Sequence, residues 1–220
     1  MSEPVIGPPS GSVLHGASVG FCGKLPARGD FVSVGLPRSF VEEWHDWMQR
    51  MLAASRAALG KEWLALWNVA PIWRFALPPG ICGPEAVLGL WMPSIDRIGR
   101  QFPLTFASVM ADTGLARMIR DGDGFLALAE AAGLDALAAD LDPGDIAARL
   151  AGDIASTQPA AGIAPEFRVC DGALWWSNVG NSAAIGAVAF ATPGLPDAEA
   201  FIRMLQPGKS VGGAECPNPS

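Results

Sequence analysis

Apolar residues recur at helical spacing in two early segments of the chain. The first spans residues 37–58 and is followed by Gly60; the shorter second spans residues 62–69 and stops at Pro71. A stripe of apolar positions every three or four residues is typical of a helix that packs one face on a core. Glycine closes helices because it accepts the left-handed conformation. We therefore predict two helices, the first of which buries Phe40, Val41, Trp44, Trp47, Met48, Met51, Leu52 and Ser55.

Short apolar runs bounded by turn-forming residues predict strands in the rest of the chain. Two of them, 86–92 and 104–110, are almost wholly apolar, as in a strand that is buried on both faces. Asp171-Gly172 separates two further runs and is typical of a two-residue hairpin turn. The predicted strands are 19–25, 72–77, 86–92, 104–110, 167–170, 173–177 and 184–191.

Residues 115–152 are rich in Ala, Leu and Asp and carry apolar positions at helical spacing, so they predict a helical block. Asp142 suits the N-cap of a helix with Pro143 at its first position, so we expect a break in the block there. A last helix is predicted over 195–205.

Strands before and after the helical block favour one fold class. Some strands are joined by short turns and others are separated by helices, which predicts an α/β fold. We expect a single-domain three-layer α/β sandwich with a mixed, largely antiparallel central sheet flanked by helices. The domain would span 17–206, with a motif-bearing half at 17–110 and a helical, sheet-completing half at 111–206. Residues 1–16 and 207–220, rich in Gly and Pro, read as a flexible leader and a flexible tail.

Composition narrows the possible partners. The 220 residues are 50% hydrophobic and 17% charged, with a net charge of −7. An acidic chain is a poor non-specific nucleic-acid binder, because displacing counterions from phosphates needs a basic face. No apolar run is long enough for a spanning helix, and the leader lacks the pattern of a signal peptide. With four scattered cysteines, these features predict a cytoplasmic protein that neither binds nucleic acid nor inserts into a membrane.

Two Gly- and Pro-containing loops concentrate the charged residues that follow strands. The first, within 20–37, carries Lys24, Arg28 and Asp30, and the second lies within 92–104. We expect both loops at one end of a common sheet, where they form the working surface. Guanidiniums and a carboxylate on such loops can pair with each other, including across to Arg28 or Asp30, or bind an acidic or phosphorylated partner. The candidate partner-binding residues are Lys24, Arg28, Asp30, Ser94, Asp96, Arg97 and Arg100.

Catalytic and metal sites have weak support in this sequence. Cys22, His45 and Asp46 could form a nucleophile, base and orienting group, but Cys22 lies in an apolar strand and His45 between tryptophans. Two histidines without ligand spacing predict no metal site, and we expect no cofactor. Consecutive strand residues face opposite sides of a sheet, so one of Trp175 and Trp176 is a candidate for an exposed interface anchor, with core packing as the alternative.

Four ordered blocks resemble a known protein family. They are Gly-Phe-Cys-Gly-Lys-Leu-Pro-Ala-Arg-Gly-Asp-Phe-Val at 20–32, Leu-Pro-Arg-Ser-Phe at 36–40, Trp-Arg-Phe-Ala-Leu at 73–77 and Met-Pro-Ser-Ile-Asp-Arg-Ile-Gly-Arg-Gln-Phe-Pro-Leu at 92–104. These blocks are similar to the TagF (ImpM) family of accessory proteins of bacterial type VI secretion. The similarity covers roughly 19–110, and from residue 111 onward the match is loose.

The resemblance implies a non-enzymatic cytoplasmic regulator that represses type VI secretion assembly post-translationally. The implied partner is the forkhead-associated scaffold protein of the system, and the implied fold is an α/β sandwich. Two alternatives stay open: a structural subunit of the secretion apparatus, and a hydrolase that uses Cys22 or Asp30. The sequence leaves the oligomeric state open.

Overall fold

One antiparallel sheet forms the middle of the molecule. The computed structural model describes residues 17–111, 114–152, 172–178 and 187–206. Within them the strand order is β2-β1-β5-β4-β3-β6-β7, and every pairing is antiparallel. The largely antiparallel sheet of the prediction is thus confirmed, and the described strands contain no parallel pair. The strands are β1 (Ser18–Gly23), β2 (Val32–Val34), β3 (Trp73–Leu77), β4 (Ala86–Met92), β5 (Leu104–Met110), β6 (Ala173–Asn178) and β7 (Ala187–Thr192).

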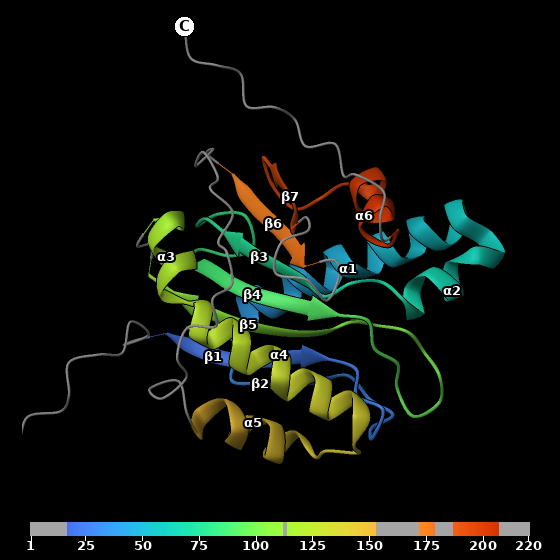
Figure 1. The fold of residues 1–220 in the computed structure, drawn as a ribbon, viewed down its shortest axis with the longest axis horizontal. Coiled ribbons are helices and arrows are strands. Elements are labelled where there is room, and N and C mark those ends of the chain that lie inside the picture. Colours follow the sequence, from blue (N-terminus) through green and yellow to red (C-terminus); the bar gives the residue numbers. More distant parts are fainter. Residues whose placement is uncertain (1–16, 112–113, 153–171, 179–186, 207–220) are drawn as a thin grey trace, which may run out of the picture.

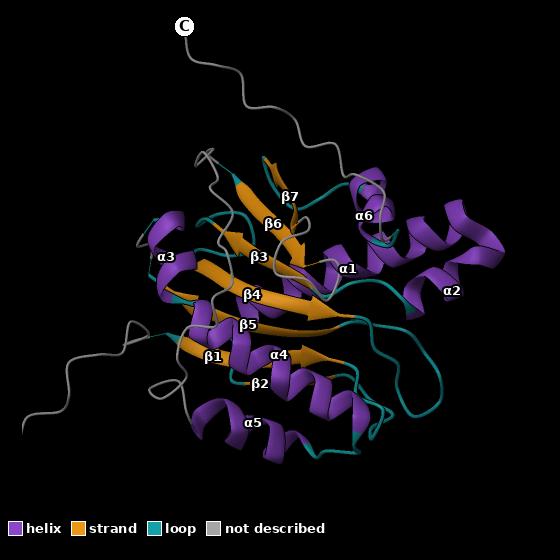
Figure 2. Ribbon diagram, in the orientation of Figure 1, coloured by secondary structure: helices purple, strands orange, loops and turns teal. Residues whose placement is uncertain are grey.

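Helices cover both faces of this sheet and complete three layers (Figures 1 and 2). One face packs against α1 (Arg38–Leu59), the short 3-10 helix η1 (Gly60–Glu62), α2 (Trp63–Asn68) and α6 (Ala198–Met204). The other packs against α3 (Leu115–Asp121), α4 (Asp123–Ala138) and α5 (Pro143–Gly152). The predicted three-layer α/β sandwich is therefore the observed architecture. None of the helices in the described part is long and apolar enough to cross a bilayer.

Alternation along the central strands explains why their sequences are apolar throughout. In β4, Val87 and Trp91 belong to the core under α1, whereas Leu88 and Leu90 belong to the core under α4. All seven residues of β4 and all seven of β5 are buried. Side chains alternate between the faces of a strand, so a strand covered on both sides must be apolar at every position.

The core under α1 is built largely from aromatic rings. Trp44 of α1 stacks on Phe75 of β3 at 4.6 Å between ring centroids, and Trp175 of β6 stacks on Trp44 at 6.3 Å. Buried indole N–H groups need an acceptor. Trp44 donates to Thr105 Oγ1 at 3.0 Å, and Trp175 donates to Thr192 Oγ1 at 3.1 Å. The first bond connects α1 to the sheet, and the second connects the neighbouring strands β6 and β7.

Most predicted elements in the described part are confirmed. Helix α1 matches the predicted range, and seven of the eight predicted residues on its inner face are buried; the eighth, Val41, is half-buried. Gly60 ends that helix with a φ of 52°. The helical block divides into α3, α4 and α5, with the break at Asp142, which accepts the Gly144 N–H. Strand β2 was not predicted, because three residues are too short for a periodic pattern.

Some predictions fall wholly or partly outside the described residues. The strand 167–170 and residue Asp171 of the hairpin signal lie there. The last predicted strand, 184–191, is described from residue 187, where β7 begins.

The prediction of an exposed anchor at Trp175 or Trp176 is wrong. The two side chains do face opposite sides of the sheet, one in each core. However, Trp175 is 0% exposed and Trp176 is 5% exposed. Each side chain belongs to a buried cluster that includes residues from segments distant in the chain.

Replacing Trp175 with alanine should strongly destabilise the fold, because its ring lies at the centre of the aromatic cluster. We expect Trp175→Ala to lower the free energy of unfolding by roughly 3–5 kcal/mol. Urea denaturation measures this directly. The matched control is Leu64→Ala on α2, whose side chain is 48% exposed; its effect should stay within about 0.5 kcal/mol. Equal effects of the two substitutions would contradict the placement of Trp175.

Candidate functional site

Sheet topology brings the two charged loops together. Strands β1 and β4 both pair antiparallel with β5, so they run in the same direction and end at the same end of the sheet. Gly23 and Met92, the last residues of β1 and β4, both pair with Leu104. The segments that follow them therefore start on either side of β5. Figure 1 shows the long β4–β5 loop extending beyond the sheet at this end. The predicted common location of the two loops is confirmed.

A buried carboxylate joins the two loops. Asp96 is 2% exposed, and its Oδ2 accepts hydrogen bonds from Lys24 Nζ and from Arg100 Nε, both at 2.6 Å. Its Oδ1 accepts the backbone N–H groups of Ile98 at 3.0 Å and Arg100 at 2.8 Å. One aspartate therefore binds a cation of the first loop and shapes the turn of the second.

Further bonds between the loops surround this carboxylate. Ser94 Oγ donates to the carbonyl oxygen of Lys24 at 2.7 Å, and the Arg97 N–H donates to the carbonyl oxygen of Arg28 at 3.0 Å. Arg100 also donates to the carbonyl oxygen of Gly29. We refer to Lys24, Ser94, Asp96 and Arg100 as the loop junction.

The loop junction keeps Asp96 ionised. Burial alone would raise the pKa of this carboxyl, but hydrogen bonds from Lys24, from Arg100 and from the Ile98 N–H outweigh burial and hold the pKa well below its usual range. A buried charge that loses its partners is costly. The carboxylate and its donors therefore stabilise each other, and the two loops form one unit.

The predicted site residues separate into two groups. Lys24 is largely buried, and Ser94 and Asp96 are buried. These three residues hold the loops together. Arg28, Asp30 and Arg97 are exposed. Arg100 belongs to both groups, since its side chain is 55% exposed while it binds Asp96.

The pairing among the loop residues considered from sequence is present between Arg100 and Asp96, but the side chain that pairs across the loops is Lys24 and not Arg28 or Asp30. Arg28 forms an ion pair with Asp142, at the N-terminus of α5, and neither of the carboxylates Asp30 and Asp96 pairs with it in the described structure. The two partners are 114 residues apart in the chain, and no local pattern could have predicted their contact. The helical half of the chain thus contributes to the loop surface.

Sequence reasoning also missed apolar residues at this end. Ile95 is 41% exposed and Ile98 is 68% exposed, and both belong to the β4–β5 loop. The base of the loop is supported by α2, whose Trp67 donates its indole N–H to the carbonyl oxygen of Ser94 at 3.3 Å. The signal was present in the sequence, since two isoleucines interrupt a polar turn.

The hypothetical Cys22 nucleophile is poorly suited to catalysis. Cys22 is 1% exposed, and burial together with the nearby Cys82 raises the pKa of its thiol to about 12. A nucleophilic cysteine needs the thiolate form and access to substrate. The His45 ring packs against Phe31 and Phe102, with Nε2 3.2 Å from Gln49 Nε2. No hydrogen bond joins Cys22 to His45 in the described structure.

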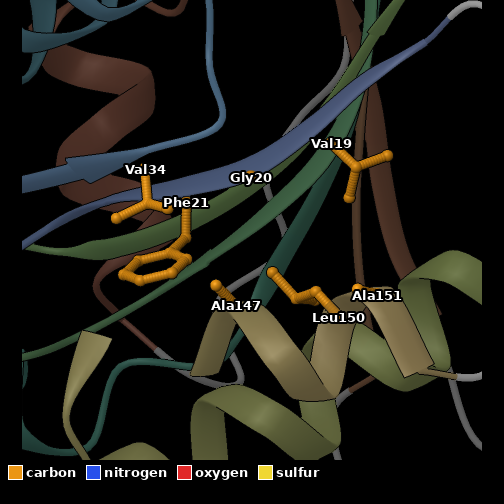
Figure 3. Close-up of a pocket in the computed structure, with 7 residues that line it drawn as sticks. All are labelled: Val19, Gly20, Phe21, Val34, Ala147, Leu150 and Ala151. Atoms are coloured by element: carbon orange, nitrogen blue, oxygen red, sulfur yellow. The ribbon is translucent and has the colours of Figure 1, made fainter. Parts of the chain in front are cut away.

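A separate apolar cavity lies beside β1, away from the loop junction. It has a volume of about 150 Å³ between β1, β2 and α5, and Figure 3 shows Ala147 and Leu150 of α5 facing Phe21 and Val34. Its walls carry no ionisable side chain. The cavity is lined mainly by apolar side chains and shares no lining residue with the loop junction, so its side chains offer no acid, base or metal ligand. Within the described residues, no group of His, Cys, Asp and Glu could hold a metal ion.

The fold and the joined loops define a three-layer α/β sandwich that presents a hydrogen-bonded pair of loops at one end. Comparison with known proteins gives the family. The chain belongs to the TagF N-terminal domain family, described as type VI secretion system-associated, whose model matches residues 20–152. The match extends beyond the sequence blocks noted above and includes α3, α4 and α5. The protein is thus associated with type VI secretion.

A solved structure supports this membership. The crystal structure of PA0076 from Pseudomonas aeruginosa PAO1 is 35% identical in sequence, with a TM-score of 0.68. The similarity covers 92% of this chain and 99% of that one. No curated protein matches the chain.

Removing the charge of Asp96 should change the acid sensitivity of the protein. A carboxyl whose pKa is lower in the folded state adds stability above its unfolded pKa, about 3.9, and this stability is lost as pH falls through the folded value. We expect Asp96→Asn to unfold at a lower urea concentration than wild type at pH 7, and the gap to narrow below about pH 4. Asp140→Asn, at an exposed carboxyl outside the loop junction, is the control and should change little. A gap independent of pH would contradict the ionised junction.

Thiol labelling tests the placement of the two described cysteines. In a variant with Cys170→Ser and Cys216→Ser, Cys22 and Cys82 remain, and both are buried. Because burial raises the pKa of each thiol to about 12, we expect no reaction with a thiol reagent at pH 8 in the native state. Both should react after unfolding in guanidinium. Rapid labelling of Cys22 in the native protein would restore the cysteine hydrolase hypothesis.

Proposed function

We propose that this protein is a non-enzymatic cytoplasmic regulator that represses type VI secretion assembly by binding a component of the system. The partner we propose is the forkhead-associated scaffold protein. Membership of a type VI secretion-associated family supports the setting. The observation that carries the binding role is the pair of loops held by Asp96, which presents exposed charged side chains on a fixed frame.

A preorganised loop surface suits recognition. Binding costs free energy when loops and side chains must be ordered at the interface. Here the backbone of the second loop is already held by hydrogen bonds from Ile98 and Arg100 to the Asp96 carboxylate. The exposed side chains of Arg28, Asp30 and Arg97 therefore project from loops whose backbone needs little reorganisation on binding. Exposed arginine is also a side chain that interfaces favour.

The non-enzymatic part of the proposal draws on the side chains that the hydrolase alternative requires. Cys22 is buried with a raised thiol pKa. Asp30, the other candidate, is exposed on the loop surface, and the apolar cavity is lined by other residues. Covalent catalysis needs a nucleophile beside an activating base, and no such pair supports a hydrolase at these loops.

Secretion and partner binding test the proposal together. In cells that lack this chain, we expect more secretion of the system's substrates into the medium, and in cells that overproduce it, less. A pull-down from cytosolic lysate with the wild-type chain should recover the forkhead-associated protein. Unchanged secretion in both strains would overturn the repressor role. If the chain binds the scaffold neither in lysate nor as purified protein, the proposed partner is overturned.

The same experiment separates a repressor from a structural subunit. A subunit would remain in the purified, assembled machine at fixed stoichiometry, and its loss would abolish secretion. A repressor should be absent from the assembled machine. The two roles therefore predict opposite changes in secretion when the chain is removed.

A further inference from the structure

Two exposed isoleucines flank an exposed arginine at the end of the β4–β5 loop. We call Ile95, Arg97 and Ile98 the loop tip. Ile98 is the most exposed large apolar side chain among the described residues, at 68%. Scattered exposed apolar residues are common on protein surfaces. The loop tip differs because its apolar side chains lie next to a charged one on a loop whose conformation is fixed.

Backbone hydrogen bonds fix the conformation of the loop tip. The Asp96 N–H donates to the Arg100 carbonyl at 3.0 Å, and the Gly99 N–H donates to the Asp96 carbonyl at 2.9 Å. Ile95 and Gln101 form an isolated antiparallel bridge. Gly99 has a φ of 83°, a conformation that disfavours side chains other than glycine. With Asp96 bound on both carboxylate oxygens, the tip is a short closed turn.

Charge sets Arg97 apart from its neighbours. Arg100 is paired with Asp96, and Arg28 is paired with Asp142. Arg97 is exposed, and no side chain of the described structure pairs with its guanidinium. It is therefore an uncompensated cation at the tip of an otherwise acidic protein with a net charge of −7. This combination is complementary to a surface that offers apolar contact and a carboxylate.

We propose that the loop tip is the anchor by which this protein docks into an apolar groove of its partner protein, with Arg97 paired to a carboxylate at the groove's rim. The proposal rests on the proposed partner-binding function and identifies the residues that perform it. The loop junction is then the support that positions the anchor. Burying isoleucine contributes apolar stabilisation, and a bidentate guanidinium–carboxylate pair adds direction. A single free cation does not make a nucleic-acid or membrane surface.

Single substitutions on the exposed tip separate the anchor from its support. Arg97→Glu reverses the charge, and Ile98→Asp removes the apolar contact. Neither side chain contributes to the bonds around Asp96, which use only backbone atoms at these two positions. The matched controls are Arg50→Glu, an exposed arginine of α1, and Leu134→Asp, a 50% exposed leucine of α4. Urea denaturation of all four variants shows whether each one folds like wild type.

Affinity for the purified forkhead-associated scaffold, measured by calorimetry with the full chain, is the main readout. We expect each tip variant to bind at least about tenfold more weakly, as for a central interface residue, and each control to stay within about twofold. If the wild type binds the scaffold and both tip variants bind it with the same affinity, the anchor is overturned and the proposed function stays intact. Phosphatase treatment of the scaffold should change nothing; lost binding would overturn the carboxylate and favour a phosphate.

A second measurement decides the anchor even if wild type does not bind the scaffold, which would overturn the proposed partner alone. A photo-crosslinking amino acid replaces Ile98 in the full chain in cells, with position 134 as control. A protein crosslinked from 98 but not from 134, through a segment that contains apolar and acidic residues, supports the anchor. No crosslink from 98, or one to a basic segment, overturns it.

Discussion

The Asp96 carboxylate is the interaction on which the loop surface depends. Desolvation makes a buried carboxylate unfavourable, so it is stable only when donors satisfy both oxygens. Lys24 supplies one donor from the other loop, while Arg100 and Ile98 supply the rest from the same turn. Without the carboxylate, a mostly buried ammonium and two backbone N–H groups would lose their acceptor. The carboxylate thus links the conformation of one loop to that of the other.

The Asp96 carboxylate can join the two loops only because the fold of the sandwich brings its hydrogen-bond donors within reach. Strands β1 and β4 are parallel to each other on either side of β5, and residues 72 positions apart meet where they end. The aromatic core under α1 fixes the sheet against the helix, and Trp67 of α2 extends that contact to the base of the β4–β5 loop. A continuous set of contacts thus connects the core to the base of the β4–β5 loop.

Local patterns predicted the elements well and their long-range contacts poorly. The stripe of α1, the two apolar strands β4 and β5 and the common end of the charged loops all follow from periodicity and strand order. The ion pair of Arg28 with Asp142 does not, because it depends on how α5 packs against the sheet. The burial of Trp176 does not either, because a strand sequence does not say which distant segments cover its second face.

Burial also changes what the charged loop residues mean. From sequence, all seven candidates looked equivalent as partner contacts, yet a substitution at Lys24, Ser94 or Asp96 would disturb the loop conformation before it touched any partner. Loss of binding in such a variant would say nothing about the contact surface. Only residues whose side chains point outward while their backbone holds the turn, such as Arg97 and Ile98, can report on recognition itself. Arg28 lies between these cases, because its side chain is exposed yet is paired with the N-terminus of α5.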